Sequence, residues 1–298
     1  MKKIFNVAGH FFYIEAGADF QLWEMMGESY GPFETNCPEG EYLFGIVVGE
    51  PIRINDKSLV YSNIEDSESE FVRFSVHRAD NGDCYFEIAQ PFSHYINAHL
   101  SISSDFSLCV LNLYGSVTEQ WQTLNTAVNL CYHIACVRNN TIVLHASSVE
   151  YKGRAYLFLG KSGTGKSTHA RMWKKALDEV ILINDDHPIL RVQEGNVMVY
   201  GSPWSGKTRC YKNIRFPLGG IIRIARAPYN KVHKLSVIES YASLVASCGG
   251  MTWDRNFADN RDSIIQDIIA SAPCWKMECL PDEEAAIECS SAVAGVWK

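Results

Sequence analysis

Residues 155–177 read AYLFLGKSGTGKSTHARMWKKAL and contain three local patterns in succession. The apolar run at 155–159 predicts a buried strand. A glycine-rich stretch follows, and beyond it Ala170, Trp173 and Leu177 recur at the spacing of one helical face. A strand that leads through a glycine-rich loop into a helix is typical of an α/β protein.

The glycine-rich stretch fits the pattern G-x-x-x-x-G-K-[ST] at every position. Glycines let successive backbone N–H groups curl around a phosphate, and the helix that follows aims its positive N-terminus at the same anion. Lys166 would reach the β- and γ-phosphates of a nucleoside triphosphate, and the Ser167 hydroxyl would bind magnesium. The sequence therefore predicts ATP and Mg²⁺ as cofactors. The residues expected around the nucleotide are Gly160, Ser162, Gly163, Thr164, Gly165, Lys166, Ser167 and Thr168.

A second copy of the pattern spans residues 201–208, GSPWSGKT. No helical pattern follows it, and Pro203 would stiffen the loop. We therefore predict that the first copy holds the phosphates. The second copy is interpreted as a surface loop that brings Lys207 and Arg209 near the transferred group, as possible acceptor or phosphate contacts. The alternative is a solvated basic turn.

Two adjacent carboxylates, Asp185 and Asp186, come directly after the apolar run at 180–183. A buried strand that ends there delivers them to the carboxyl edge of the sheet, beside the glycine-rich loop. One can hold magnesium and the other can accept a proton from an attacking hydroxyl. In isolation, two acids at a strand end are more simply a solvated turn.

His145 ends another apolar run, 141–145, and is a candidate for the same cleft; the alternative is a hydrogen-bonded core residue. His187, beside the two acids, remains open between a functional and a structural role. The other histidines are interpreted as structural: His10, His77, His94, His99, His133, His169 and His233.

The composition limits the class of protein. The chain has 298 residues, 47% hydrophobic and 20% charged, which is typical of a soluble globular protein. Its net charge of −7, without a cluster of Lys and Arg, argues against nucleic acid as a partner. Ten cysteines without a Cys-x-x-Cys favour free thiols in a reducing compartment. Because neither a signal peptide nor a membrane-spanning run is recognisable, we expect a cytoplasmic protein with no membrane partner.

Two domains are predicted. Residues 1–115 contain short alternating or aromatic runs separated by turns, which indicates a smaller β-rich N-terminal domain rather than helices. Residues 116–298 begin with a helical pattern over 117–138 and continue with apolar strands that alternate with helices. Such strands favour an α/β sheet covered on both faces. At the C-terminus we expect helices over 237–246, 263–271 and 282–296, with a strand over 275–280.

Several of these stretches together resemble one superfamily. LHASSV at 144–149, FLGKSGTGKS at 158–167 and NDD at 184–186 look like the core of the HPr kinase/phosphorylase and ATP-dependent phosphoenolpyruvate carboxykinase superfamily. The resemblance implies a P-loop-containing mixed sheet flanked by helices, of the carboxykinase type. By the same resemblance, Lys166 and the loop amides bind phosphates, and Ser167 and Asp186 hold the metal. Asp185 then acts as the base, and His145 lies near the phosphates or a second metal.

The chain also departs from this family. The carboxylate-binding segments of the carboxykinases and the P-G-R-N signature of the HPr kinases are both absent, and Thr168 stands where those kinases have an acid. The expected function is an ATP-dependent phosphotransferase that acts on a hydroxyl acceptor, serine or a serine-containing peptide or protein. The alternatives are a catalytically silent nucleotide-binding regulatory protein, the reverse phosphorolysis of a phosphoserine and, less favoured, a carboxykinase-type enzyme. HPr kinases are hexameric, which makes a homo-oligomer possible.

Overall fold

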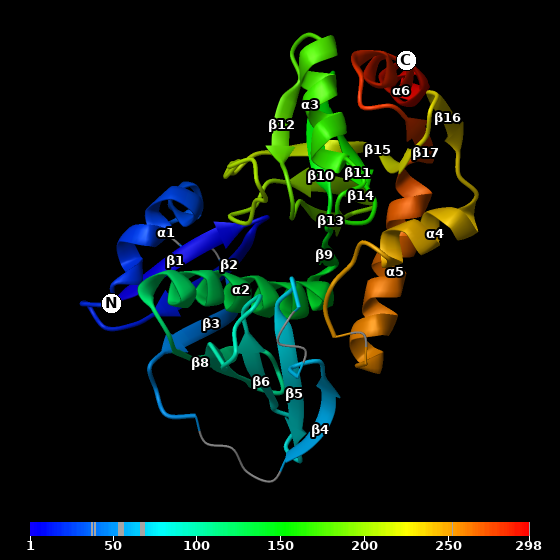
Figure 1. The fold of residues 1–298 in the computed structure, drawn as a ribbon. Helices are drawn as coiled ribbons and strands as arrows, with labels where there is room; N and C mark the ends of the chain where they lie inside the picture. Colours follow the sequence, from blue (N-terminus) through cyan, green and yellow to red (C-terminus); the bar gives the residue numbers. More distant parts are fainter. Residues whose placement is uncertain (37, 39, 53–56, 66–68, 252, 298) are drawn as a thin grey trace. The chain divides into compact units, whose positions relative to one another are not determined.

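The computed structural model describes all residues except 37, 39, 53–56, 66–68, 252 and 298. The chain divides into two compact units, Met1–Cys136 and Val137–Lys298 (Figure 1). The division falls after helix α2 (Val117–Cys136), which we had assigned to the second domain. The structure corrects that boundary because the helix packs onto β3, β7 and β8 of the first unit.

The first unit is an eight-stranded sheet in the order β1-β2-β3-β8-β7-β6-β5-β4. The pairs β2–β3 and β3–β8 are parallel and the other pairs are antiparallel. Helix α2 buries Leu124, Val128 and Tyr132, and the Tyr132 hydroxyl donates to the Val7 carbonyl at 2.9 Å. The strands are β1 (Lys2–Val7), β2 (His10–Glu15), β3 (Tyr42–Val48), β4 (Lys57–Ser62), β5 (Arg73–Ala79), β6 (Cys84–Ala89), β7 (Ala98–Ile102) and β8 (Leu108–Leu113).

The β-rich character predicted for this unit is confirmed, but helix α1 (Leu22–Tyr30) was not predicted. Leu22, Trp23, Met26 and Tyr30 are buried at helical spacing along it. The sequence therefore does contain the apolar spacing of a helix, but a helix of this length is too short to be recognised from that spacing alone. A short 3-10 turn, η1 (Gly31–Phe33), follows α1.

The second unit is a nine-stranded mixed sheet. Its long strand β15 pairs in parallel with β11 and β17 and antiparallel with β14. The order along the main path is β12-β10-β11-β15-β14-β13-β9, and β16 joins through β17. The strands are β9 (Thr141–Val143), β10 (Ser147–Tyr151), β11 (Arg154–Leu159), β12 (Ile181–Asn184), β13 (Ile189–Gln193), β14 (Asn196–Tyr200), β15 (Arg215–Arg226), β16 (Lys231–Lys234) and β17 (Cys274–Cys279).

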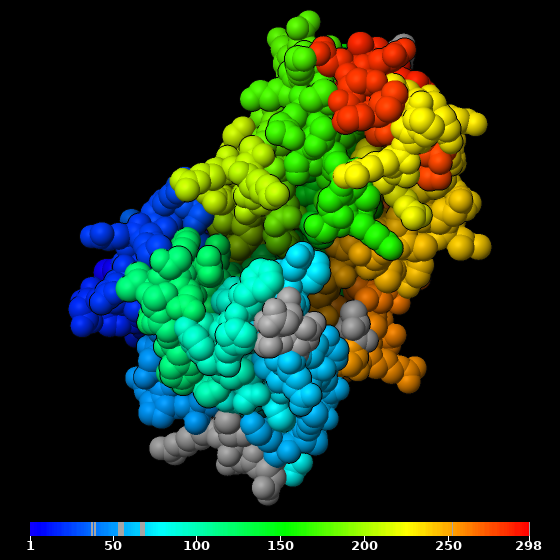
Figure 2. Space-filling view, viewed as in Figure 1, coloured from blue at the N-terminus to red at the C-terminus, as the bar shows by residue number. Residues whose placement is uncertain are grey.

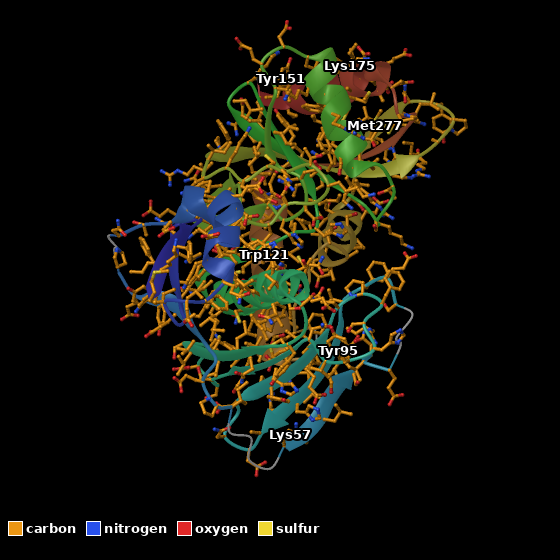
Figure 3. The ribbon with its side chains drawn as sticks, turned by 60° about the vertical axis from the view of Figure 1, so that its left-hand side comes forward. Lys57, Tyr95, Trp121, Tyr151, Lys175 and Met277 are labelled. Carbon is orange, nitrogen blue, oxygen red and sulfur yellow. The ribbon has the colours of Figure 1, made fainter. Side chains whose placement is uncertain are left out.

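Helices cover this sheet in two places. Helices α3 (Lys166–Ala176) and α6 (Glu283–Ala294) lie side by side, and Lys175, at the far end of α3, forms an ion pair with Glu283 (Figure 3). Beneath them, Trp173 and Met277 are fully buried in one apolar cluster that also contains residues of β10, β11 and β15. Helix α5 (Arg255–Ser271) packs against β9, β13 and β14, and α4 (Val237–Val245) packs against α5. The unit is completed by the 3-10 turns η2 (Val137–Asn139) and η3 (Gly295–Trp297).

The predicted α/β class, a mixed sheet flanked by helices, agrees with this unit, and most predicted elements lie within a few residues of their observed bounds. Helix α5 begins earlier than expected because Asp254 caps its N-terminus, accepting from the Phe257 amide at 2.9 Å. All nine cysteines that the structure describes are free thiols, as expected; Cys37 lies outside the described residues. Across the described chain, none of the helices combines the length and the apolar character that a membrane crossing requires.

Candidate active site

The glycine-rich loop connects β11, which ends at Leu159, to α3, which begins at Lys166. Three of its glycines have positive φ angles: 152° at Gly160, 76° at Gly163 and 111° at Gly165. At Gly160 a Cβ atom would also lie 2.6 Å from the Thr164 hydroxyl oxygen. These positions therefore require glycine, both for the backbone conformation and, at Gly160, for space.

Side-chain hydrogen bonds fix the loop just before α3. The Thr164 hydroxyl donates to the Lys161 carbonyl at 2.6 Å, and the Arg226 guanidinium donates to the Gly163 carbonyl. Gly165 is the N-cap of α3 and offers no side-chain cap. The first N–H groups of the helix thus have no side-chain acceptor from the cap, which is the arrangement that binds anions at helix N-termini.

Lys166 is buried at the base of this loop. Its ammonium donates to the Gly160 carbonyl at 2.9 Å and lies 3.2 Å from Nε2 of His145. Burial lowers the pKa of Lys166, while the charges of Asp186 and Asp185 act in the opposite direction. Because the ammonium has only donors, the contact with His145 requires that Nε2 of the imidazole be unprotonated and accept.

His145 lies between this lysine and the acid pair. Its Nε2 atom lies 3.5 Å from Oδ1 of Asp186, and the His187 Nδ1 atom lies 3.2 Å from Oδ2 of the same carboxylate. Burial and the charge of Lys166 lower the pKa of His145, and Asp186 opposes them. Burial would raise the pKa of Asp186, but the hydrogen bond from His187 and the charges of His187, His145 and Lys166 outweigh it and lower that pKa. Asp186 is therefore ionised beside the lysine.

Asp185 has a different environment. It is 5% exposed, and the Ser147 hydroxyl donates to its Oδ1 atom at 2.9 Å. Within the described part of the chain, its Oδ2 atom is buried without a hydrogen-bond partner. A buried carboxylate oxygen without a partner is costly and is commonly found where a cation or a donor from a ligand binds.

The structure thus brings together the predicted residues Lys166, His145, Asp185 and Asp186. His187, for which the sequence allows a functional or a structural role, belongs to the same group. Ser167 and Thr168 lie partly exposed in the first turn of α3, and Ser162 is exposed in the loop.

Asn184, which no sequence pattern singled out, organises the acid pair. Its side-chain oxygen accepts from the amides of Asp186 and His187 at 2.9 and 2.7 Å. Its side-chain nitrogen donates to the Trp204 carbonyl at 3.0 Å and to the Ser202 hydroxyl at 3.1 Å. An asparagine at the end of a strand is a common turn signal, but a bond to a residue twenty positions later has no local signature.

The second glycine pattern, at 201–208, leads into an irregular segment and no helix, as expected. It lies against the acids: a Cβ atom on Gly206 would be 3.0 Å from the Asp185 carbonyl oxygen and 3.5 Å from Cγ of Asp186. Lys207 and Arg209 are exposed beside it, and Figure 2 shows this yellow-green part of the chain at the surface of the second unit.

A cavity of about 350 Å³ opens beside the first turn of α3, at the ends of β15 and β17. Its wall is mainly apolar, with one guanidinium at its edge. The lining includes Thr168, His169, Ile224, Arg226, Leu280 and Pro281. Its size and character fit a flat organic group next to the glycine loop.

The donors present fit magnesium better than a transition metal. In the described residues, no three His, Cys, Asp or Glu side chains are grouped closely enough to hold a metal ion. Magnesium needs fewer protein ligands, because it usually binds one or two carboxylates together with substrate phosphates and waters. Asp186, whose pKa is lowered and which lies beside Lys166 and His145, supplies such a carboxylate.

Comparisons with known proteins add little to this geometry. No family model and no curated protein matches the chain. Among solved structures, the HPr(Ser) kinase/phosphatase from Coxiella burnetii aligns over 43% of this chain and 90% of its own, at 9% identity and a TM-score of 0.22. Since so low a score carries no weight for fold or activity, the functional conclusion depends on the site itself.

Proposed function

We propose that this protein is an ATP-dependent phosphotransferase that moves a γ-phosphoryl group to a hydroxyl acceptor, serine or a serine-containing peptide or protein. One observation supports this most directly. Nε2 of His145 lies 3.2 Å from the ammonium of Lys166, at the base of the glycine loop, and 3.5 Å from Oδ1 of Asp186. An anion-binding loop that faces two carboxylates is the arrangement that phosphoryl transfer requires.

The loop would hold the nucleotide by its phosphates. The N–H groups of residues 163–167 are the proposed donors, and Lys166 would neutralise charge on the β- and γ-phosphates. The cavity beside Thr168 and Arg226 would take the base or the ribose. Ser167 and Asp186 would hold magnesium, which when bound offsets the charge of the phosphate oxygens.

Asp185 is the proposed general base. Ser147 fixes one of its oxygens at 2.9 Å, which leaves Oδ2 for the acceptor. The acceptor hydroxyl would give its proton to Oδ2 while its oxygen forms a bond to the γ-phosphorus. The bond from that phosphorus to the β–γ bridging oxygen breaks, and the nucleoside diphosphate leaves with the electron pair.

Two substitutions test this proposal. Lys166→Ala should weaken Mg·ATP binding by about tenfold or more, since a charge-assisted contact to phosphate is lost. Lys174→Ala, on the same helix but exposed, should not change it. Calorimetry measures both affinities, and equal binding by wild type and Lys166→Ala would show that the loop is not the phosphate site.

Asp185→Asn separates an enzyme from a silent binder. Asparagine keeps an oxygen for Ser147 but cannot take a proton. We expect ATP consumption with alcohol acceptors such as serine and short serine peptides to fall by about a hundredfold or more, with Mg·ATP affinity retained. Binding without turnover in the wild-type protein, with every acceptor tried, would favour the regulatory alternative instead.

A further inference from the structure

A second cavity, of about 360 Å³, lies at the end of the second unit that is away from the glycine loop. Arg154 begins β11 and lines this cavity, whereas the glycine loop follows Leu159, about 17 Å away at the other end of the same strand. Tyr151, at the end of β10, marks this end of the unit in Figure 3. The wall is made by the turn between β10 and β11, the residue after α3, the last turns of α6 and η3.

The hydroxyl of Tyr156 is an unused hydrogen-bond donor at this cavity. Tyr156 lines the cavity although it is only 1% exposed, and its hydroxyl has no hydrogen-bond partner among the residues that the structure describes. Burial raises the pKa of Tyr156 to about 12, against the charge of Arg154, so the hydroxyl keeps its proton at neutral pH. A buried hydroxyl without a partner is costly, and a ligand that brings an acceptor removes that cost.

The Arg154 guanidinium is held close to this hydroxyl. A Cβ atom on Gly219 would be 2.8 Å from Cζ of Tyr156, which carries the hydroxyl, and 2.9 Å from Cβ of Arg154. The guanidinium lies over the Trp297 ring, 3.7 Å from its centroid, and donates to the Leu218 carbonyl at 3.3 Å. The Trp297 indole donates to the Gly219 carbonyl at 2.7 Å. Arg154 is therefore fixed in place, with most of its five N–H donors still free for an anion.

The cavity carries an excess of positive charge in a chain whose net charge is −7. Lys152 and Arg154 line it and form no ion pair with any described residue, and no described Asp or Glu is part of the wall. Glu150, whose charge also acts on Tyr156, is buried and accepts from the Gly153 amide at 2.7 Å. Two cations against one acid leave a single positive charge, which matches a monoanion.

The rest of the wall is apolar or aromatic. Leu177 and Ile287 line the cavity with Tyr151 and Trp297, and Ile287 is half exposed. A sugar or another polyhydroxyl anion would place its hydroxyls against these side chains without acceptors. A flat ring instead buries apolar area and packs against the aromatic side chains.

We propose that this cavity binds an aromatic carboxylic acid, with the carboxylate on Arg154 and the Tyr156 hydroxyl and the ring against Tyr151 and Ile287. The inference goes beyond the proposed phosphotransferase function and does not depend on it, because the nucleotide would bind at the other end of β11.

The test is calorimetry with three probes that separate the charge from the ring. Indole-3-acetate has both, indole-3-acetamide lacks the charge and acetate lacks the ring. Wild type should bind indole-3-acetate about tenfold or more tightly than either of the other two, since a charge-assisted contact or an apolar contact is lost in each. An excess of Mg·ADP should not displace it.

Variants assign the binding to this cavity. Tyr156→Phe should weaken indole-3-acetate binding by about tenfold without lowering thermal stability, because the hydroxyl has no partner in the described protein. A purely structural role for the hydroxyl would do the opposite. Arg154→Gln should reduce the preference for the acid over the amide to about twofold or less. Lys231→Ala, an exposed lysine of β16, should leave the affinity unchanged.

Four results would overturn the inference. They are equal binding of acid and amide by wild type, binding of none of the probes, displacement of indole-3-acetate by Mg·ADP, and an affinity that Tyr156→Phe leaves unchanged. Failure of the proposed function is separate, because it appears as equal nucleotide binding by wild type and Lys166→Ala and leaves the binding of indole-3-acetate as it is.

Discussion

Asn184 lets the coupling between the acid pair and the second loop be tested by one substitution. Its side chain makes four hydrogen bonds of 2.7–3.1 Å, two to the amides of Asp186 and His187 and two to the loop at Ser202 and Trp204. Asn184→Ala removes all four. The substitution leaves the amides of Asp186 and His187, the Ser202 hydroxyl and the Trp204 carbonyl without their bonds to Asn184, and all of these groups are buried or partly buried.

The expected loss in the free energy of unfolding follows from the number of hydrogen bonds removed. A typical internal hydrogen bond contributes about 1 kcal/mol net, and a buried group left unsatisfied costs about 1–3 kcal/mol. The Trp204 carbonyl keeps one bond, from the Ser202 hydroxyl at 3.0 Å. We therefore expect Asn184→Ala to lower the free energy of unfolding by about 4 kcal/mol. Asn184→Asp keeps the two accepting bonds but turns an oxygen toward the Trp204 carbonyl, and should cost about 2–3 kcal/mol.

Urea denaturation, followed by tryptophan fluorescence and circular dichroism, measures these losses. Asn196→Ala is the matched control, because Asn196 is exposed at the start of β14, and it should change stability by less than about 0.5 kcal/mol. In the folded Asn184 variants, the affinity for metal-free ADP should stay within about threefold of wild type, because the glycine loop is separate, while phosphoryl transfer is lost. A cost below about 1 kcal/mol for Asn184→Ala, or unimpaired transfer, would refute the claim that this amide positions the acids.

Two further predictions concern the glycine loop and the helix that follows it. Gly160→Ala should cost more than Gly195→Ala: both glycines have positive φ, but only at Gly160 does a Cβ atom meet the Thr164 hydroxyl, at 2.6 Å. The control should lose about 1–2 kcal/mol and bind Mg·ATP normally, whereas Gly160→Ala should lose nucleotide binding as well; equal costs in thermal unfolding would contradict this. His169 accepts from the Trp173 indole at 3.1 Å, and burial lowers its pKa from 6.5 to about 4. As the pH falls below the unfolded value, the unfolded chain binds a proton that the folded chain does not, so stability should drop by roughly 2 kcal/mol between about pH 7 and about pH 5. His169→Gln keeps an acceptor and should remove this part of the pH dependence; an unchanged slope in urea denaturation would show that His169 is not its source.

The local pieces of the candidate site could be predicted from the sequence, because each depends on residues close together in the chain. The glycines at 160, 163 and 165 are needed for backbone angles that other residues rarely adopt, and the helix after them follows from apolar spacing. The acid pair could likewise be placed at a strand end. Helix α1 was not predicted because a short helix has a weak periodic signal. The boundary between the units was placed before α2 because the packing of α2 onto β3, a strand far from it in sequence, has no local signature.

Only the tertiary structure decided which of these pieces meet. His145, Lys166 and Asp186 come from three separate segments. Their contacts at 3.2 and 3.5 Å arise because β10, which follows His145, pairs with both β11 and β12, and the chain runs from the ends of these two strands to Lys166 and Asp186. Asn184 ties the second glycine pattern to the acids through bonds to residues eighteen and twenty positions away. The patterns of local sequence report backbone angles and periodicity, whereas contacts between distant segments depend on how the whole sheet is ordered and packed.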